Sequence, residues 1–319
     1  MKQEQRKMKI GEIAKLAGVS PSTVSRVFNH HASISEEVRQ KVLAVAREHA
    51  YHPRLTSKQR NVVIITPYSS MYPPQCCVEM ILMALTRELP KRGFRLEILP
   101  HDNLERLASM QFCAAAAIGA EPEDFRNWSN EQNVPLVMID RDMETRSPDV
   151  YVVRPDVAMG VDLALDKLTS SGRKRIGCII HGKPGTGNAD LRAEAIRKYM
   201  KKKNLPEMIH FGDDQEYLEI IGKLLRRKID ALFCPGGSGG ILAAYALSLF
   251  GKQIPEDVAL IASEQTFFSR YGIPPQTTIS PDYTELASAV ADVIESRING
   301  DPVKRKTVLP YVLIERESV

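Results

Sequence analysis

Hydroxyl, amide and guanidinium side chains gather in one short stretch near the N-terminus, SPSTVSRVFN at positions 20–29. Such groups hydrogen-bond phosphate oxygens and the edges of bases, so the chemistry they offer is recognition of a nucleic acid and not the making or breaking of bonds. The candidate DNA-contacting residues of this stretch are Ser20, Pro21, Ser22, Thr23, Ser25, Arg26 and Asn29.

Two short helices joined by a tight turn would position these groups. Apolar residues recur at helical spacing from Ile10 to Ala17, and Gly18 then ends the first helix. Ser20 is a good N-cap for the second helix, and Pro21 takes its first position, where a missing N–H costs nothing. The pattern predicts a helix-turn-helix whose second helix enters a DNA major groove. Motif geometry alone leaves open a helical hairpin that only packs.

A third helix, predicted over residues 33–50, gives the hairpin a shared core. Ser35 would cap it, and Glu36 and Glu37 stand at its positive end. Its apolar stripe consists of Val38, Val42, Val45, Ala46 and His49. Residues 1–61 hold twelve Lys and Arg against five Asp and Glu, whereas the whole chain of 319 residues has a net charge of only +4. A basic head on a mildly acidic body indicates that the head meets a polyanion.

The run AKLAGVSPSTVSRVFN, followed after a polar turn by ISEEVRQKVLAVAREHAYHP, resembles the DNA-binding headpiece of the lac repressor (LacI/GalR) family, without a gap from about Met8 to Pro53. The resemblance implies that Arg26 contacts phosphate or a guanine edge, with Ser22 and Thr23 at the floor of the groove. Pro21 is unusual at its place in the family. Because it cannot donate a hydrogen bond, specificity is expected to depend on Ser22 and on apolar contact with thymine methyl groups.

The segment after the head departs from the family pattern. The family usually has a short helix here, with a leucine that wedges into the minor groove and kinks the DNA. Only RLTSKQRN, residues 54–61, is present, and Leu55 is its sole apolar side chain. A helix this short is marginal, so we expect an extended linker in which Arg54, Lys58 and Arg60 hold phosphates, with weak operator bending and a steep dependence on salt. The alternative is that Leu55 still wedges from a strained single turn.

From Val62 onward, apolar runs of strand length alternate with helical patterns, which predicts parallel sheets covered on both faces. The expected strands are Val62–Thr66, Arg95–Leu99, Ala114–Ile118, Leu136–Ile139, Arg175–Ile180, Ile209–Phe211, Ala231–Cys234 and Val258–Ala262. The expected helices are Val78–Lys91, Val157–Ser171, Leu191–Lys203, Tyr217–Arg227 and Ile241–Phe250. The fold class expected is therefore an all-α helix-turn-helix head plus an α/β body of two doubly wound lobes.

Several body segments, among them VPLVMIDR, LTSSGRKRIGCI, IPEDVALIA, IPPQTTISP and VLPYVLIERES, resemble the periplasmic-binding-protein-like effector domain of the same family. The resemblance implies three crossings between the lobes. The expected divisions are a head at 1–53, a linker at 54–61 and a body at 62–319, with the first lobe at about 62–153 and 281–306 and the second at about 154–280 and 307–319. It further implies a cytoplasmic, nucleoid-associated homodimeric repressor of a palindromic operator in double-stranded DNA, with apolar residues of Val78–Leu89 contributing to the dimer.

The family also implies a pocket for a small, sugar-like effector or related metabolite between the lobes. Its usual Asn-Asp pair is Gly236-Gly237 here, and its usual Gly-aromatic-Asp-Asp is ASEQ at 262–265, so several polar groups are changed. The candidate effector-binding residues are Tyr68, Met71, Asp156, Arg192 and Glu264. Each has an ordinary structural alternative: an ion pair, a helix cap or loop packing. The alternative function is a DNA-binding regulator with a vestigial pocket, constitutive or controlled by a protein partner.

Other classes of protein find little support in the residues. GKPGTGNA at 182–189 follows an expected strand as a P-loop does, but Asn188 and Ala189 stand where the phosphate-binding Lys and the Mg²⁺-binding Ser or Thr are needed. No catalytic constellation stands out, and the five scattered cysteines and the pair His30-His31 lack metal-ligand spacing, so neither an enzyme nor a cofactor or metal is expected. No apolar run is long enough for a membrane span, and MKQEQRKMK does not resemble a signal peptide, which makes a secreted ligand receptor a remote reading.

Overall fold

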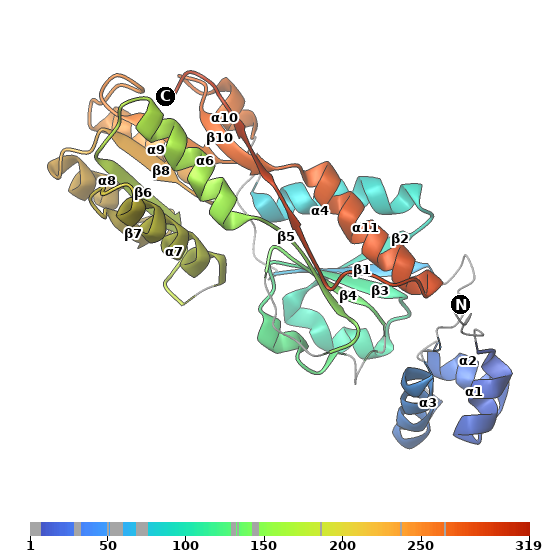
Figure 1. The fold of residues 1–319 in the computed structure, drawn as a ribbon. Coiled ribbons are helices and arrows are strands. Elements are labelled where there is room, and N and C mark those ends of the chain that lie inside the picture. Colours follow the sequence, from blue (N-terminus) through green and yellow to red (C-terminus); the bar gives the residue numbers. More distant parts are fainter. Residues whose placement is uncertain are drawn as a thin grey trace, which may run out of the picture.

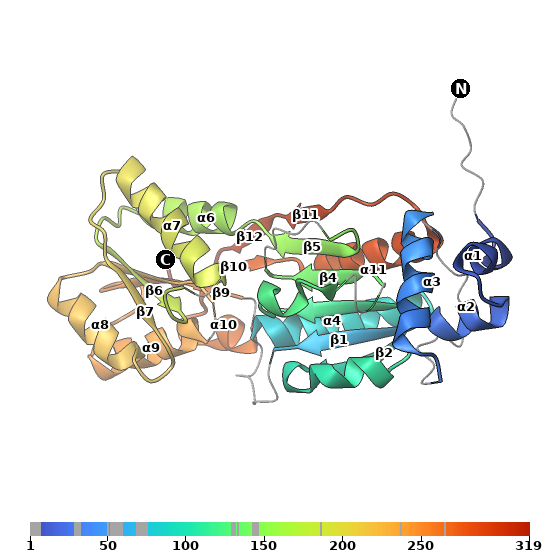
Figure 2. The same ribbon diagram turned by 90° about the horizontal axis from the view of Figure 1, so that it is seen from below.

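A three-helix head is followed by two α/β lobes, and the three units lie in a row (Figure 2). The computed structural model describes residues 8–28, 33–49, 51, 60–67, 76–128, 132, 134–141, 147–185, 187–236, 238–264 and 266–319. Within these ranges, no helix is long and apolar enough to cross a membrane.

Local capping chemistry defines the helices of the head. Gly18 adopts φ 64° at the end of the first helix, a left-handed conformation that glycine takes without strain. The hydroxyl of Ser20 accepts from the N–H of Thr23 (3.1 Å), and that of Ser35 accepts from the N–H of Val38 (3.4 Å). The helices are α1 (Ile10–Ala17), α2 (Pro21–Phe28) and α3 (Glu36–Glu48). Their shared core contains Ile13, Ala14, Ala17, Val24, Val27, Val42, Leu43, Ala46 and Tyr51.

The first lobe has a six-stranded sheet in the order β11-β5-β4-β3-β1-β2, and all its neighbouring strands are parallel. Two long helices, α4 and α11, cover one face, and short helices with a Phe/Trp cluster cover the other. Its elements are β1 (Asn61–Thr66), α4 (Cys77–Lys91), β2 (Arg95–Pro100), η2 (His101–Ser109), β3 (Ala114–Ile118), η3 (Pro122–Phe125), β4 (Leu136–Ile139), β5 (Val150–Pro155), α11 (Tyr283–Asn299) and β11 (Lys306–Leu309).

The second lobe repeats this plan with the order β12-β10-β9-β8-β6-β7, in which only the edge pair β10–β12 is antiparallel. Helices α6 and α7 cover one face, and α8 and α9 cover the other. Its elements are α6 (Val157–Ser170), β6 (Ile176–His181), α7 (Gly187–Lys202), β7 (Ile209–Gly212), α8 (Tyr217–Arg226), β8 (Ala231–Cys234), α9 (Gly239–Leu249), β9 (Ala259–Ser263), α10 (Phe267–Tyr271), β10 (Thr277–Pro281) and β12 (Tyr311–Ile314).

The expected fold class is confirmed, since each strand expected from an apolar run is present within one residue of its expected bounds. Two details differ. Helix α7 begins at Gly187 and not at Leu191, because the Asp190 carboxylate accepts from the N–H of Gly185 and turns the glycine-rich loop directly into the helix. The third crossing between the lobes lies at Pro310, three residues later than expected, because β11 still pairs with β5 in the first lobe.

The two sheets present their carboxyl ends to one another. In open α/β sheets, ligands bind outside the carboxyl ends of the strands, where the strand order reverses. The reversal lies between β1 and β3 in the first lobe and between β6 and β8 in the second. Described residues that directly follow strands of these sheets, such as Asp140 after β4 and Glu264 after β9, therefore lie at the boundary between the lobes, which the crossing segments bridge (Figure 1).

Candidate functional site

Helix α2 presents a polar outer face over an apolar inner one. Val24 and Val27 are buried, while Pro21, Ser22 and Arg26 are exposed. The other two candidates on this helix, Thr23 and Ser25, are half-buried. The short helix therefore offers its hydroxyls and one guanidinium to the outside.

The hydroxyl of Ser20 organises the start of this face. It lies 2.7 Å from the hydroxyl of Ser22 and 2.8 Å from that of Thr23, in addition to capping the helix. Three hydroxyls are thus held in one cluster at the N-terminus of α2, where backbone N–H groups also favour an anion such as phosphate. The remaining DNA-contacting candidates, Asn29, Arg54, Leu55 and Lys58, lie outside the described residues, as do residues 54–59 of the linker. Arg60, which we expected to hold a phosphate, instead lies against the first lobe, with its guanidinium 4.4 Å from the centre of the Phe94 ring and 3.8 Å from the carboxylate of Glu295.

Glu264 is the most deeply buried acid of the cleft, with 2 % of its surface exposed, directly after β9. It accepts hydrogen bonds from the hydroxyl of Tyr283, at the start of α11, and from that of Ser280 (3.5 Å). Burial raises the pKa of Glu264 to about 7, although the Tyr283 hydrogen bond and the charge of Arg192 oppose the rise. This carboxyl group therefore exchanges a proton near neutral pH.

Arg192 lies on α7 against the glycine-rich loop after β8. A Cβ atom at Gly236 would stand 2.5 Å from the Nη1 atom of Arg192, so the guanidinium lies directly over the backbone of that glycine. A glycine at this position therefore leaves the room that the guanidinium occupies. Burial raises the pKa values of both Asp140 and Glu264, and the charge of Arg192 opposes both rises, so one cation acts on carboxyl groups of both lobes.

Asp140, directly after β4, is the residue of the first lobe that lies near Arg192 and Asn188. Its backbone carbonyl accepts from the Nδ2 atom of Asn188 on α7 (2.7 Å), a hydrogen bond that joins the two lobes. Desolvation raises the pKa of the Asp140 carboxyl. Asp140 and Glu264 have φ values of 60° and 73°. Left-handed backbone is uncommon for residues other than glycine, and strain of this kind tends to cluster at binding sites.

The candidates for the effector pocket thus divide into three groups. Arg192 and Glu264 belong to one inter-lobe cluster, which we define as Asp140, Asn188, Arg192, Glu264 and Tyr283. Asp156 is the N-cap of α6, and its Oδ1 atom accepts from the N–H of Met159 (3.1 Å). Tyr68 and Met71 lie outside the described residues.

The sequence interpretation missed three members of the inter-lobe cluster. Asp140 carried a usable signal, because it directly follows an expected strand at the carboxyl edge of a parallel sheet. Asn188 was considered only as a failed P-loop position. Tyr283 carried no local signal, because only the second crossing between the lobes brings it to Glu264.

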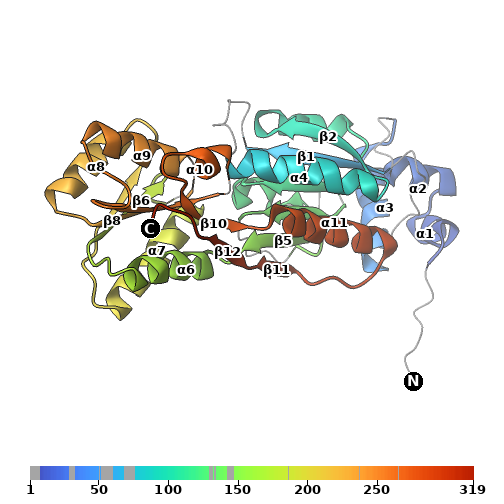
Figure 3. The ribbon, with the colours of Figure 1, turned by 90° about the horizontal axis from the view of Figure 1, so that it is seen from above.

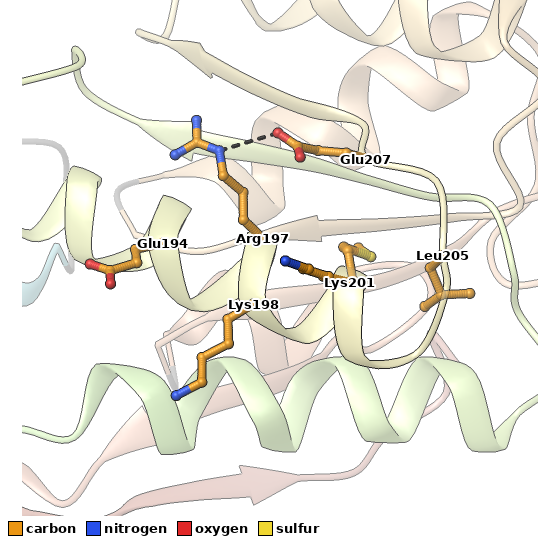
Figure 4. A pocket seen from close by; sticks show the side chains of 7 residues that line it. Glu194, Arg197, Lys198, Lys201, Leu205 and Glu207 are labelled. Carbon is orange, nitrogen blue, oxygen red and sulfur yellow. Dashed lines mark hydrogen bonds and ion pairs between the residues drawn. The ribbon is translucent and has the colours of Figure 1, made fainter.

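A separate hollow of about 600 Å³ lies on the outer side of α7. Figure 4 shows its long charged side chains, with Arg197 and Glu207 joined at 3.2 Å. Such exposed ion pairs contribute little, and the hollow contains none of the sequence candidates. Within the described residues, no group of three or more His, Cys, Asp and Glu side chains is arranged to hold a metal ion.

Two family descriptions match parts of the chain. Residues 9–54 match "Bacterial regulatory proteins, lacI family" and residues 165–319 match "Periplasmic binding protein-like domain". Among curated relatives, the HTH-type transcriptional regulator DegA of Bacillus subtilis (strain 168) is 28% identical, over 98% of both chains. The ribose operon repressor of Escherichia coli (strain K12) is 26% identical, over 96% of this chain and 98% of the repressor.

Solved structures share the fold at lower identity. A complex of the transcriptional regulator CelR with cellobiose has a TM-score of 0.72 and 24% identity, and the comparison covers 98% of this chain and 100% of CelR. A lac repressor dimer bound to operator and the anti-inducer ONPF has a TM-score of 0.68 and 21% identity, with 98% and 99% of the two chains covered. The order of head and two lobes is therefore the same in these proteins.

Proposed function

We propose that this chain is a member of the lacI family of bacterial regulatory proteins, and that it is a transcriptional repressor that binds operator DNA through α2 and senses a small molecule between its lobes. The observation that carries the proposal is the exposed hydroxyl and guanidinium face of α2 on a packed three-helix head. We assign no catalytic role to the protein, because its relatives named above are regulators, and we place it in the cytoplasm at the nucleoid.

Arg26→Ala is expected to weaken operator binding by about 1–3 kcal/mol, because it removes the one exposed guanidinium of the α2 face described here. The measurement is a gel-shift titration with a DNA fragment that the wild-type protein selects from genomic DNA. Arg126→Ala, which removes an equally exposed arginine from the body, serves as the control and should leave the affinity unchanged. Equal affinities for all three proteins would remove Arg26 from the interface.

A second copy of the chain is the partner we propose for an apolar surface on the second lobe. Helix α9 exposes Ile241, Tyr245 and Leu249, which lie four residues apart on one side of the helix. The rings of Phe267 and Tyr271 on α10 lie 4.8 Å apart, and Ile273 after them is 98% exposed. We call these six residues the aromatic face. Contiguous apolar surface of this kind marks an interaction site.

The first lobe extends this surface along α4. Helix α10 and the beginning of α4 lie on the same side of the molecule, where the two lobes meet (Figure 3). On α4, Ile81, Leu85 and Leu89 are buried against the core of the first lobe, whereas Met83 is 50% exposed. We therefore propose that Met83 and the aromatic face contribute to one dimer interface that spans both lobes. Two heads are needed because a single module makes too few base contacts for tight specific binding.

The effector we propose is a sugar-like or related metabolite held by the inter-lobe cluster. One relative is a repressor of a ribose operon and another is in complex with cellobiose, and both of these sugars are rich in hydroxyl groups. Hydroxyls both donate and accept, so they suit a group that combines a guanidinium, two carboxyls and an amide. Arg192 would donate to the effector, and Glu264 would accept from it. The second candidate is a vestigial pocket, which the existing Tyr283–Glu264 and Asn188–Asp140 hydrogen bonds favour, because they already occupy these groups.

Arg192→Ala is expected to abolish any rise in melting temperature that an effector causes, because the acceptor groups of the effector that the guanidinium would hold would be buried and left unpaired. The measurement is a thermal-shift screen with a sugar panel that includes ribose and cellobiose. Arg197→Ala, on the outer side of the same helix, is the matched control and should retain the shift. A shift that survives Arg192→Ala would place the pocket elsewhere. The absence of any shift with the wild-type protein would support the vestigial pocket.

A further inference from the structure

The end of the second lobe that faces away from the cleft is strongly basic. Strands of its parallel sheet run toward the cleft, so the helix ends and loops that precede them gather at the opposite end. Three segments found there, 173–175 (RKR), 197–203 (RKYMKKK) and 223–228 (KLLRRK), hold twelve Lys and Arg and no Asp or Glu. We propose that this end, which we call the distal basic surface, binds the phosphate backbone of a second DNA segment, in addition to the operator held by the head.

Hydrogen bonds hold the three segments together as one surface. The guanidinium of Arg175 donates to the carbonyl of Lys228 (2.8 Å) and to that of Arg227, which joins the first segment to the third. The hydroxyl of Tyr199 on α7 donates to the Oδ1 atom of Asp166 on α6 (2.6 Å), which joins the second segment to the helix that leads into Arg173. The clustering therefore belongs to the fold and not only to the sequence.

Acidic neighbours offset only part of this charge. Arg197, Lys203 and Lys223 form ion pairs with Glu207, Asp166 and Glu219 at 3.2, 3.3 and 2.5 Å. The Asp230 carboxylate accepts from the backbone N–H groups of Lys174 and Arg175 (3.0 and 2.9 Å), so it is directed at the backbone. The side chains of Lys174, Arg226 and Lys228 are exposed.

His210, the second residue of β7, lies near two cations of the third segment. Burial lowers the pKa of this imidazole, and the positive charges of Arg227 and Lys223 lower it further. The imidazole therefore lies close enough to the third segment for its pKa to report a change in the charge there.

Helix ends alone do not account for this surface. Lys and Arg in the last turn of a helix complement its negative end, and α6, α7 and α8 all end here. That effect is confined to the last turn of each helix and needs one or two cations. Residues 173–175 lie beyond the end of α6, and all five basic residues of 197–203 are exposed, on the last two turns of α7 or directly after it. The basic charge exceeds what the helix ends require.

The composition of the surface favours DNA over a protein partner. Protein interfaces have an apolar, aromatic core and are depleted in Lys. The aromatic residue of these segments, Tyr199, is 4% exposed, and Met200 is 2% exposed. The solvent-exposed groups of these segments are ammonium and guanidinium groups, which bind phosphates without distinguishing base sequence. The head lies at the opposite end of the molecule, so the surface reaches a different stretch of DNA (Figure 1).

A two-step capture experiment tests this bridging role. Full-length protein is loaded on an excess of bead-bound 200-base-pair duplex, washed, and offered a fluorescent 30-base-pair duplex of unrelated sequence in about 50 mM salt. The wild-type protein should capture the second duplex and lose most of it at 200 mM salt, because phosphate contacts depend steeply on salt. The variant Lys174→Glu/Arg226→Glu should capture at least about fivefold less.

The control variant Arg106→Glu/Arg126→Glu makes the same charge change on the first lobe and should capture as much as the wild type. Equal capture by all three proteins would overturn the proposal. Tighter retention of poly-glutamate than of the duplex would also overturn it, because the partner would then be an acidic protein. If the beads retain no protein, the proposed function of the head fails, and the second readout below still tests the surface.

That second readout is the NMR titration of His210, which does not depend on the head. Phosphates near Arg227 and Lys223 should offset their charges and raise the pKa of His210 when the 30-base-pair duplex is added. The rise should be absent in Lys174→Glu/Arg226→Glu. An unchanged titration of His210 in the wild-type protein at saturating duplex would contradict DNA binding at this surface.

Discussion

Glu264→Gln is expected to raise the free energy of unfolding by about 3 kcal/mol at pH 8 and to change it little below pH 4.5. Burial raises the pKa of Glu264 from 4.5 to about 7. Each unit of such a shift corresponds to about 1.4 kcal/mol. At pH 8 the wild-type protein must keep a buried carboxylate ionised, whereas the amide is neutral and can still accept from the hydroxyl of Tyr283.

The sign of the pH dependence follows from proton binding. Between about pH 4.5 and 7 the folded protein holds a proton on Glu264 that the unfolded chain has released, so the stability of the wild-type protein falls as the pH rises through this window. Urea unfolding at a series of pH values from 4.5 to 8 measures the slope. Glu285→Gln, an exposed change nearby on α11, should keep the slope of the wild type. An unchanged slope in Glu264→Gln would mean that this carboxyl is not desolvated.

Binding of an effector in the cleft would be coupled to the protonation of Glu264. A ligand that donates hydrogen bonds or brings positive charge to Glu264 favours the carboxylate, and so releases a proton on binding near pH 7. A ligand with a carboxylate of its own would favour the protonated form and take up a proton. The proton exchange thus reports which kind of group the effector presents to Glu264.

The sequence was most informative where the causes of structure are local. Gly18, Ser20 and Ser35 specify the ends of the head helices through backbone conformation and caps that involve neighbouring residues only. The inner strands, such as Ala114–Ile118, are buried on both faces and therefore read as continuous apolar runs. By contrast, β11 is an edge strand with exposed residues, and its apolar pattern does not distinguish one lobe from the other.

The inter-lobe cluster could be inferred only in part, because its members meet across long separations in sequence. Arg192 and Glu264 were selected through the family resemblance, whereas Tyr283 reaches Glu264 only because the chain crosses between lobes at Asp282. Asp156 shows the reverse case: the residue type suits ligand binding, but its carboxylate caps α6. The residue type alone does not distinguish a carboxylate that binds a ligand from one that caps a helix.

The sequence pattern also does not predict the aromatic face, for a physical reason. FFSRY at 267–271 has the composition of a core segment, and its sequence does not indicate which of the side chains are exposed to solvent. In the structure Ser269 is the buried residue of α10, and its hydroxyl donates to the carbonyl of Glu264 (3.2 Å). The polar residue thus turns inward to support the loop of the cleft, and the aromatic rings turn outward.

Tyr271→Asp is expected to separate the proposed dimer and to weaken operator binding by at least about a hundredfold. Tyr271 is 64% exposed, and its ring lies against that of Phe267, so a carboxylate there would be desolvated and unpaired in an interface between two copies. The loss in operator affinity follows because two linked heads gain about 10²- to 10⁴-fold over one.

Light scattering at micromolar protein measures the first effect, and gel-shift titration with the selected genomic fragment measures the second. Leu218→Asp makes a comparable change at an exposed apolar residue of α8, outside the aromatic face, and should leave both the dimer and the affinity intact. A Tyr271→Asp protein that remains dimeric would exclude this face from the interface. Monomers with unchanged operator affinity would show instead that one head suffices, and would remove the reason for a dimer.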